Sequence, residues 1–229
     1  MPFYLFVYVT LLPFYLVLYN IVVSNTLFKQ IKNQFKVNEL FSASDIPLKN
    51  YSMDSLKEEL SRLVAKKEIT RFAKGLYYLG DDKSKTKPSC YDAIAKRYLY
   101  HGKETIGFYS GPQFPLLIAS LSPKDTLPLF VYTNKATSGK RSVFLFSRRV
   151  ELRKPYLPIS ADNVSINSFL TYLAITPIGE IEQNYSVLAN FIRSNQLSAN
   201  DVMSLVPRFP AKTFSKLLKS DLYRSLWKH

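Results

Sequence analysis

The spacing of apolar positions predicts a series of short helices that begins near residue 27. The first apolar residues fall at i, i+1, i+4 and i+8, the spacing of one helical face: Leu27, Phe28, Ile31 and Phe35. Residues 37–46 continue as a second short helical stretch, for which Ser42 or Ser44 offers a cap. Pro47 marks its end, because the residue before a proline disfavours helical backbone.

The clearest helix in the sequence begins after residue 51. Ser52 suits its N-cap because the hydroxyl can accept a hydrogen bond from a backbone N–H, and Asp54 favours the positive end of the helix dipole. Apolar side chains then repeat at helical spacing and predict the buried stripe: Met53, Leu56, Leu60, Leu63 and Val64. The helix should end near Lys66 or Lys67, since basic residues suit its carbonyl end.

Two runs of strand-forming residues follow this helix and predict a β-hairpin. The runs are 69–72 and 76–79, and Gly75 ends the loop between them because it adopts left-handed backbone without steric penalty. Arg71 and Lys74 should project from the tip. Three helices followed by a basic hairpin are the plan of a winged helix-turn-helix, which we assign to residues 27–80.

In a winged helix-turn-helix the third helix enters the major groove of DNA, while the hairpin contacts phosphates or the adjacent minor groove. Arg62 can pair with a guanine edge, Ser55 is small enough to approach a base, and Glu58 can accept a hydrogen bond from cytosine. The predicted DNA-binding residues are Ser52, Ser55, Glu58, Arg62, Lys66, Arg71 and Lys74. Helix-and-hairpin modules also bind proteins, and Glu58 beside Glu59 weakens the case for DNA, so a protein-interaction module is the alternative.

The charged and polar residues 81–88 predict a linker to a second domain over residues 89–229. Its expected elements are a helix at 91–100, a glycine-containing turn at 107–112, strands at 127–132, 142–146 and 150–153, helices from 165 onward, one capped by Ser198, and a final helix at 213–227. The expected fold class is therefore α+β: an N-terminal winged helix-turn-helix followed by a mixed α/β domain with a helical C-terminal tail.

Residues 1–26 carry no charged side chain, and the run 3–19 is apolar or aromatic except for Thr10 and Pro13. A span of about 20 apolar residues is what a bilayer-crossing helix needs. Lysines follow it and, by the positive-inside rule, would keep the rest of the chain in the cytoplasm: Lys29, Lys32 and Lys36. Three interpretations of this segment stay open. Residues 1–24 are an inner-membrane anchor, or they are a buried element of the fold, or they are an extension translated from a start assigned too early.

Composition adds a net charge of +14, from 31 Lys and Arg against 17 Asp and Glu in 229 residues. This excess suits a polyanion, either nucleic acid or an anionic membrane surface. It is densest over 135–154, where Glu151 opposes seven basic residues: Lys135, Lys140, Arg141, Arg148, Arg149, Arg153 and Lys154. Such a cluster on strands can hold phosphates without reading sequence, but lysine and arginine also protect sheet edges from aggregation, and both interpretations stay open.

The reactive residues favour a binding protein over an enzyme. One Cys and two His leave no disulfide framework and no Cys-rich zinc site. The adjacent acidic pairs lie on a predicted helix, Glu58-Glu59, and in the predicted linker, Asp81-Asp82, so they do not converge as a catalytic site requires. We expect no catalytic residue, no bound metal and no cofactor.

Three segments in order resemble one family. Residues 52–80, SMDSLKEELSRLVAKKEITRFAKGLYYLG, are similar to its recognition helix and wing, although Lys66-Lys67 stands where a Gly is usual and Leu76 precedes Tyr77. Residues 105–141, with their Thr-Asn and basic follow-on, resemble its segment after the linker, and 206–218, VPRFPAKTFSKLL, resembles its closing helix. The chain thus looks like an AbiEi-type antitoxin of bacterial abortive-infection, type IV toxin–antitoxin systems, over residues 27–229.

This resemblance implies a cytoplasmic transcriptional autorepressor. Its N-terminal module would bind double-stranded DNA at inverted repeats upstream of its own operon. Its C-terminal domain would counter a nucleotidyltransferase-like toxin encoded next door, for which direct toxin contact is not required. The resemblance implies no catalytic residues, and residues 1–26 have no counterpart in it.

Overall fold

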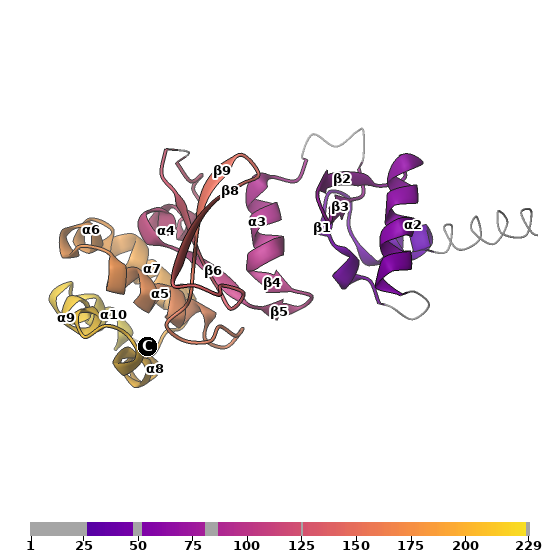
Figure 1. The fold of residues 1–229 in the computed structure, drawn as a ribbon. Helices are drawn as coiled ribbons and strands as arrows, with labels where there is room; N and C mark the ends of the chain where they lie inside the picture. Colours follow the sequence, from indigo (N-terminus) through magenta and orange to yellow (C-terminus); the bar gives the residue numbers. More distant parts are fainter. Residues whose placement is uncertain (1–26, 48–51, 81–86, 125, 228–229) are drawn as a thin grey trace, which may run out of the picture. The chain divides into compact units, whose positions relative to one another are not determined.

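A computed structural model describes residues 27–47, 52–80, 87–124 and 126–227 (Figure 1). The fold is mixed α+β, as expected from the sequence at that level. The chain divides into two compact units between Ala93 and Ile94, within helix α3 (Cys90–Tyr98). The extension 1–26 and most of the predicted linker lie outside the described residues. Within the described stretches, no helix combines the length and apolarity needed to cross a bilayer.

The first unit combines helices with a small three-stranded sheet. Its elements are a helix over residues 27–34, β1 (Leu40–Phe41), the 3-10 helix η1 (Ala43–Asp45), α2 (Met53–Ala65), β2 (Thr70–Ala73) and β3 (Leu76–Tyr78). The strand order is β1-β3-β2, and both neighbouring pairs are antiparallel. The central strand β3 is buried along its whole length, which joins the hairpin to the core.

Apolar side chains from helices and strands meet in the core of this unit. The most deeply buried are Leu27, Ile31, Phe41, Leu56, Leu60, Leu63 and Ile69. Phe35 at the end of the first helix stacks on Phe41, with ring centroids 4.5 Å apart. Burial of each such side chain contributes about 1.5–3 kcal/mol. The predicted helical face that begins at Leu27 is therefore confirmed.

The predicted second helix over residues 37–46 is wrong for most of its length. Residues of β1 pair with β3 instead, and Leu40 lies opposite Tyr78. Only η1 turns helically, and the Asp45 carboxylate accepts a hydrogen bond from the backbone N–H of Ser42 at 2.6 Å. Leu40 and Phe41 thus form a strand, although the local pattern looked helical, because they pair with β3, which lies much later in the chain.

The second unit is centred on a four-stranded mixed sheet. After α3 come the small hairpin β4 (Tyr100–His101) and β5 (Glu104–Thr105), then β6 (Gly107–Ser110), η2 (Gly111–Gln113), α4 (Phe114–Ile118), β7 (Leu129–Thr133), β8 (Lys140–Leu145) and β9 (Arg148–Arg153). The sheet order is β6-β7-β9-β8, and only β7 and β9 are parallel. The three predicted strands correspond to β7, β8 and β9.

The expected turn at 107–112 is wrong over its first four residues, because residues 107–110 form the edge strand β6. Gly107 serves close backbone packing. A Cβ at this position would lie 2.2 Å from the Tyr98 carbonyl oxygen and 2.8 Å from that of Tyr132. Gly107 therefore lets the end of α3 and strand β7 approach β6 together, which a larger residue would prevent.

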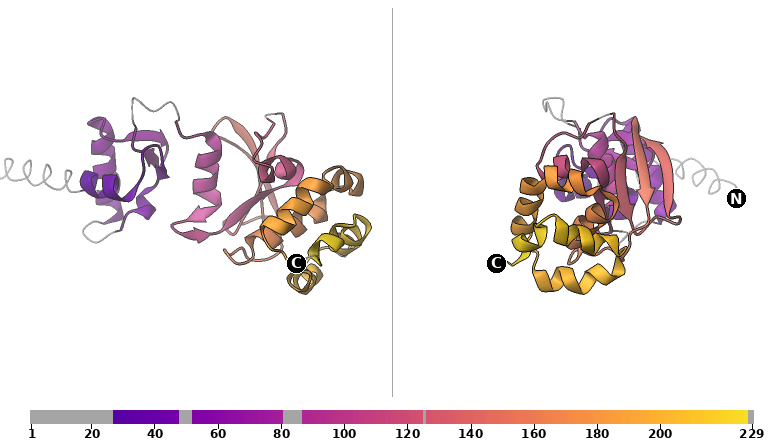
Figure 2. Two further views of the ribbon diagram at one scale, coloured as in Figure 1. Left: turned by 180° about the vertical axis from the view of Figure 1, so that it is seen from behind. Right: turned by 90° about the vertical axis from the view of Figure 1, so that its left-hand side faces the viewer.

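From residue 164 onward the chain is helical, as predicted. The helices are α5 (Val164–Ile175), α6 (Ile178–Gln183), α7 (Tyr185–Ser194), α8 (Ala199–Leu205), η3 (Val206–Arg208), α9 (Lys212–Lys219) and α10 (Leu222–Leu226). Ser198 caps α8 by accepting the backbone N–H of Asp201 at 3.1 Å. The expected single final helix is two helices, because Asp221 has a left-handed φ of 57°. Figure 2 shows this helical tail gathered beside the sheet.

Candidate nucleic-acid interface

Helix α2 begins at the predicted cap. The Ser52 hydroxyl oxygen accepts a hydrogen bond from the backbone N–H of Ser55 at 3.2 Å. The Ser55 hydroxyl donates to the Ser52 carbonyl oxygen at 3.1 Å, and its side chain is half-buried. Both serines therefore stabilise the first turn, whose backbone groups lack partners within the helix. A base contact by either hydroxyl would compete with these hydrogen bonds.

The buried face of α2 differs from the predicted stripe at two positions. Leu56, Leu60 and Leu63 are fully buried, whereas Met53 is 37% exposed. Glu59 lies on the buried side instead and is 5% exposed. Its carboxylate forms an ion pair with the guanidinium of Arg62, whose side chain is 45% exposed. Arg62, the residue expected to pair with guanine, is therefore anchored to a buried acid within its own helix.

Exposed positive charge in the first unit lies at the end of α2, in the hairpin, and on and just after the first helix, where Lys29, Lys32 and Lys36 are exposed. Glu58 and Lys66 are exposed, and the Lys57–Asp54 ion pair of 2.9 Å is also exposed. The two ion pairs offset charge along the first part of the helix. Lys67 is also an exposed cation, but it is missing from the predicted set of contact residues. Its position next to Lys66 in the sequence already indicated a second cation at the end of the helix.

The chain leaves α2 through a Schellman motif. The backbone N–H of Lys67 donates to the Val64 carbonyl oxygen at 3.0 Å, and that of Glu68 donates to the Leu63 carbonyl oxygen at 3.0 Å. Lys67 itself has a φ of 60°, in the left-handed region that glycine adopts most easily. This geometry gives a physical reason for the glycine expected here by resemblance.

The hairpin after α2 is tighter than predicted. Ala73 pairs with Leu76, so the turn consists of Lys74 and Gly75 rather than three residues. Gly75 has a φ of 76°, as its predicted role requires. Arg71 and Lys74 are both exposed. Lys74 thus lies in the turn, as predicted, whereas Arg71 lies within β2 opposite Tyr77 and not at the tip, although both side chains are exposed.

The seven basic residues between 135 and 154 do not form one exposed patch. Lys140 and Arg153 both pair with Glu151, at 3.3 and 2.6 Å. The Arg153 guanidinium also lies over the ring of Phe130, 3.9 Å from its centroid. Glu151 is 5% exposed, so this acid lies beneath the two cations. Two of the seven cations therefore share one carboxylate, which offsets one of their two positive charges.

Opposing effects act on the pKa of Glu151. Burial raises the pKa of this carboxyl, but the hydrogen bonds and charges of Arg153 and Lys140 outweigh burial, and the pKa lies below its ordinary value. The carboxylate consequently stays ionised and links β9 to β8 through Lys140, whereas its other partner, Arg153, lies on β9 itself.

Two more of the seven have structural contacts. Arg148 is 5% exposed, and its guanidinium donates to the Lys124 carbonyl oxygen at 2.6 Å. The Lys135 ammonium donates to the Arg97 carbonyl oxygen at 3.0 Å. The remaining three are exposed and available to an anionic partner: Arg141, Arg149 and Lys154.

Asn134, which belongs to the Thr-Asn pair of the second resembling segment, joins the end of β7 to a residue far along the chain. Its side-chain amide donates to the Ile159 carbonyl oxygen at 2.8 Å, and its amide oxygen accepts the backbone N–H of Ile159 at 2.9 Å. The side chain thus copies the two-way pairing of a β-bridge. Asn134 therefore has a structural role in the segment before α5 and does not belong to the group of exposed basic residues Arg141, Arg149 and Lys154.

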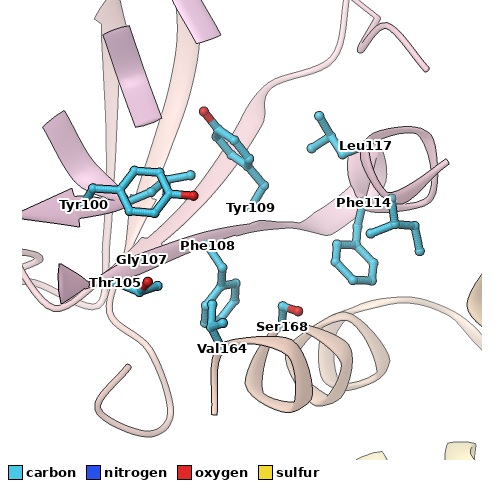
Figure 3. Close-up of a pocket in the computed structure, with 11 residues that line it drawn as sticks. Tyr100, Thr105, Gly107, Phe108, Tyr109, Phe114, Leu117, Val164 and Ser168 are labelled. Atoms are coloured by element: carbon cyan, nitrogen blue, oxygen red, sulfur yellow. The ribbon is translucent and has the colours of Figure 1, made fainter. Parts of the chain in front are cut away.

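An open pocket of about 310 Å³ lies along strand β6 (Figure 3). Its lining is apolar and hydroxylic, and includes Tyr100, Thr105, Phe108, Phe114 and Ser168. The Ser168 hydroxyl donates to the Ser165 carbonyl oxygen at 2.8 Å, which is a helix-internal bond. Among the described residues, no charged side chain or histidine lines this pocket, so its lining lacks the acid–base pair that would activate a nucleophile.

In the described part of the chain, no three His, Cys, Asp or Glu side chains are grouped so that they could hold a metal ion. Comparison with known proteins adds no assignment. No family model matches the chain, and no curated protein or solved structure matches it.

Proposed function

We propose that residues 27–80 are a winged helix-turn-helix that binds double-stranded DNA. The observation that carries this proposal is the sequence of capped helix α2, Schellman turn and basic-tipped hairpin within a sheet of order β1-β3-β2. In this assignment the helix over 27–34 comes first, η1 takes the place of a short second helix, and α2 is the recognition helix. Figure 1 lets the reader follow α2 and the three strands within the first unit.

The distribution of charge supports phosphate contact at two places in this module. Lys66 and Lys67 are exposed at the end of α2, and Arg71 and Lys74 are exposed on the hairpin. Lysine and arginine that neutralise phosphates provide most of the sequence-independent part of DNA affinity. Arg62 keeps a place in the proposed interface because 45% of its side chain is exposed despite its ion pair.

We further propose that the chain is the autorepressor and antitoxin of a type IV toxin–antitoxin system, acting in the cytoplasm. The three segments that resemble AbiEi-type antitoxins support this assignment. The first unit would repress the operon, and the second would counter a nucleotidyltransferase-like toxin. The proposal includes no catalytic role for any residue.

A band-shift titration with the DNA upstream of the chain's own gene tests the DNA-binding proposal. Arg71→Ala combined with Lys74→Ala should weaken binding, and the slope of log affinity against log salt should fall by about 0.9 for each phosphate that is no longer neutralised. Lys219→Ala, an exposed lysine on α9, is the matched control and should bind like the wild type. Equal affinity for unrelated duplexes would contradict sequence-specific repression, and unchanged binding by the double variant would contradict the wing assignment.

Co-expression with the neighbouring toxin gene tests the antitoxin proposal separately. The wild-type chain should restore growth. The Arg71→Ala, Lys74→Ala variant should also restore growth when expressed from an independent promoter, because the proposed antitoxin function belongs to the second unit. Absence of a nucleotidyltransferase gene beside this one, or failure of the wild type to restore growth, would refute the antitoxin assignment while leaving DNA binding to its own test.

A protein-interaction module is the second candidate, because α2 also exposes acids. The Asp54 side chain is 91% exposed and Glu58 is exposed. Carboxylates on a DNA-facing surface repel phosphates, whereas a basic partner protein would favour them. Glu58→Lys should therefore strengthen DNA binding if this face meets DNA. A variant with unchanged DNA affinity would place Glu58 outside the DNA interface and favour a protein partner for this face.

A further inference from the structure

The hairpin formed by β8 and β9 has one face that carries both cations and an exposed aromatic ring. The register pairs Phe144 with Arg149, Ser142 with Glu151 and Lys140 with Arg153. Residues paired directly across antiparallel strands share a face, with Cβ atoms about 4.5–5.5 Å apart. The hairpin therefore carries a row of paired side chains on this face, ending at Phe144 and Arg149 beside the turn.

Phe144 is the most exposed large apolar residue of the described chain, with 75% of its surface accessible. Arg149, directly opposite, is also exposed. Helix α5 covers the opposite edge of the sheet, where the Ser110 hydroxyl on β6 donates to the Ser168 carbonyl oxygen at 3.5 Å. The Phe144 end of the sheet is thus left open on this face.

The charge on the face of Phe144 is one-sided. Three basic side chains, Lys140, Arg149 and Arg153, share this face with one acid, Glu151, whereas strand alternation places Arg141 and Arg148 on the other face. That acid is 5% exposed and already paired with Lys140 and Arg153. The Lys140 side chain remains 57% exposed above it. Among the described residues, no carboxylate forms an ion pair with Arg149.

The turn of this hairpin holds a strained conformation. Phe146 and Ser147 have φ values of 49° and 63°, in the left-handed region. A two-residue turn with both φ values positive matches the twist of antiparallel strands, but usually uses Asn or Gly. The Arg97 guanidinium lies over the Phe146 ring, 5.2 Å from its centroid. The pair Leu145–Arg148 closes this turn and Phe144–Arg149 is the next pair, so the turn fixes the register that sets Phe144 opposite Arg149.

We propose that this face binds single-stranded nucleic acid, with a base stacked on Phe144 and phosphates held by Arg149 and Lys140. Unpaired bases stack readily on aromatic side chains of exposed sheets, and nearby cations follow the backbone. In a duplex the bases are already stacked on one another, so only the phosphates would reach this surface. The positive charge of this face disfavours a basic protein partner. The exposed ring of Phe144 favours a ligand that offers bases as well as phosphates.

Fluorescence anisotropy with a labelled single-stranded RNA of mixed sequence, about ten nucleotides long, tests this proposal, since single-strand sites span about 4–16 nucleotides. Phe144→Ala should weaken binding by roughly 5- to 150-fold, which corresponds to the loss of one stacked base. Phe144→Tyr should retain most of the affinity because it keeps the ring. Arg149→Ala should reduce the salt slope by about 0.7, the value for one phosphate of a single strand that is no longer neutralised.

Matched controls separate base stacking from general apolar binding and from unfolding. Trp227→Ala removes another exposed aromatic, outside the sheet, and should leave RNA binding unchanged. Thermal unfolding should be close to wild type for Phe144→Ala, because the side chain is 75% exposed. The same strand in duplex form should bind with an affinity that Phe144→Ala does not alter.

Three results would overturn the proposal. They are an unchanged RNA affinity in Phe144→Ala, an equal loss of affinity for single strand and duplex, and Phe144-dependent binding to anionic phospholipid vesicles without any RNA binding. The operator titrations test substitutions in the first unit, with Lys219→Ala only as a control, so failure here and failure of the proposed repressor function are distinguishable.

Discussion

The left-handed residue at the end of α2 allows a quantitative test of the local geometry. Lys67 has a φ of 60°, whereas its neighbour Lys66 has a φ of −76°. The left-handed helical conformation costs a residue with a Cβ about 1–2 kcal/mol, and glycine avoids that cost. Glycine also loses about 0.5–1 kcal/mol more on folding than alanine because its unfolded chain is freer.

Comparison of glycine with alanine at each position cancels the loss of the lysine side chain. Lys67→Gly should be more stable than Lys67→Ala by roughly 0.75 kcal/mol, the difference between the middles of the two ranges. At Lys66 the backbone is right-handed, so only the entropy cost applies, and glycine should be less stable than alanine by about 0.5–1 kcal/mol. The two positions should therefore respond with opposite sign.

Amide hydrogen exchange in the buried part of α2 is the appropriate assay for these four variants. The only tryptophan, Trp227, lies in the second unit, so its fluorescence does not follow unfolding of the first. For amides that exchange only through unfolding of the unit, the expected free energies correspond to roughly 2- to 5-fold changes in rate. If glycine and alanine are equally stable at position 67, the left-handed geometry does not carry the cost assigned to it.

Three further substitutions test the second unit. The folded-state pKa of Glu151 is below its ordinary value of 4.5, so the stabilisation by its carboxylate is present at neutral pH and is lost as the pH falls through the folded pKa. The thermal unfolding temperature of Glu151→Gln should therefore depend less on pH in that acidic range than the wild-type temperature does. Lys216 donates to the Leu173 carbonyl oxygen at 3.0 Å, so Lys216→Met should lower stability by about 1.5–3 kcal/mol in denaturant titrations followed by Trp227 fluorescence, with Lys219→Met near wild type. Gly107→Ala should cost about 1–3 kcal/mol or more in the same titration because its Cβ would meet two backbone oxygens, and a wild-type midpoint would contradict that packing.

Local chemistry predicts α2 well because its signals act over a few residues. Ser52 caps the helix as expected, and three leucines of the predicted stripe are fully buried. Periodicity alone could not identify Glu59 as buried, because the ion pair with Arg62 decides whether a carboxylate can leave water. The exposed Met53 likewise reflects the start of the helix, where the core does not reach every turn.

The missed strands depend on contacts that the local sequence does not contain. Leu40 and Phe41 become β1 through pairing with β3, and Gly107 becomes part of β6 through pairing with β7, where it lies opposite Thr133. The dense positive run was visible in the sequence, but its division into buried, paired and exposed cations depends on the sheet register. Period-two alternation places Phe144 on the same face as the polar residues Lys140 and Ser142, and this pattern could have predicted that Phe144 is exposed.

The two-way hydrogen bonding of Asn134 makes the attachment of residue 159 sensitive to chemical ageing. Conversion of that amide to a carboxylate by deamidation would replace its donor nitrogen with an oxygen facing the Ile159 carbonyl oxygen, at a position now 2.8 Å away. The bond to the Ile159 N–H could persist, but the other interaction would become repulsive. The Asn134 amide nitrogen thus decides whether the end of β7 keeps both hydrogen bonds to Ile159, in the segment that leads into α5.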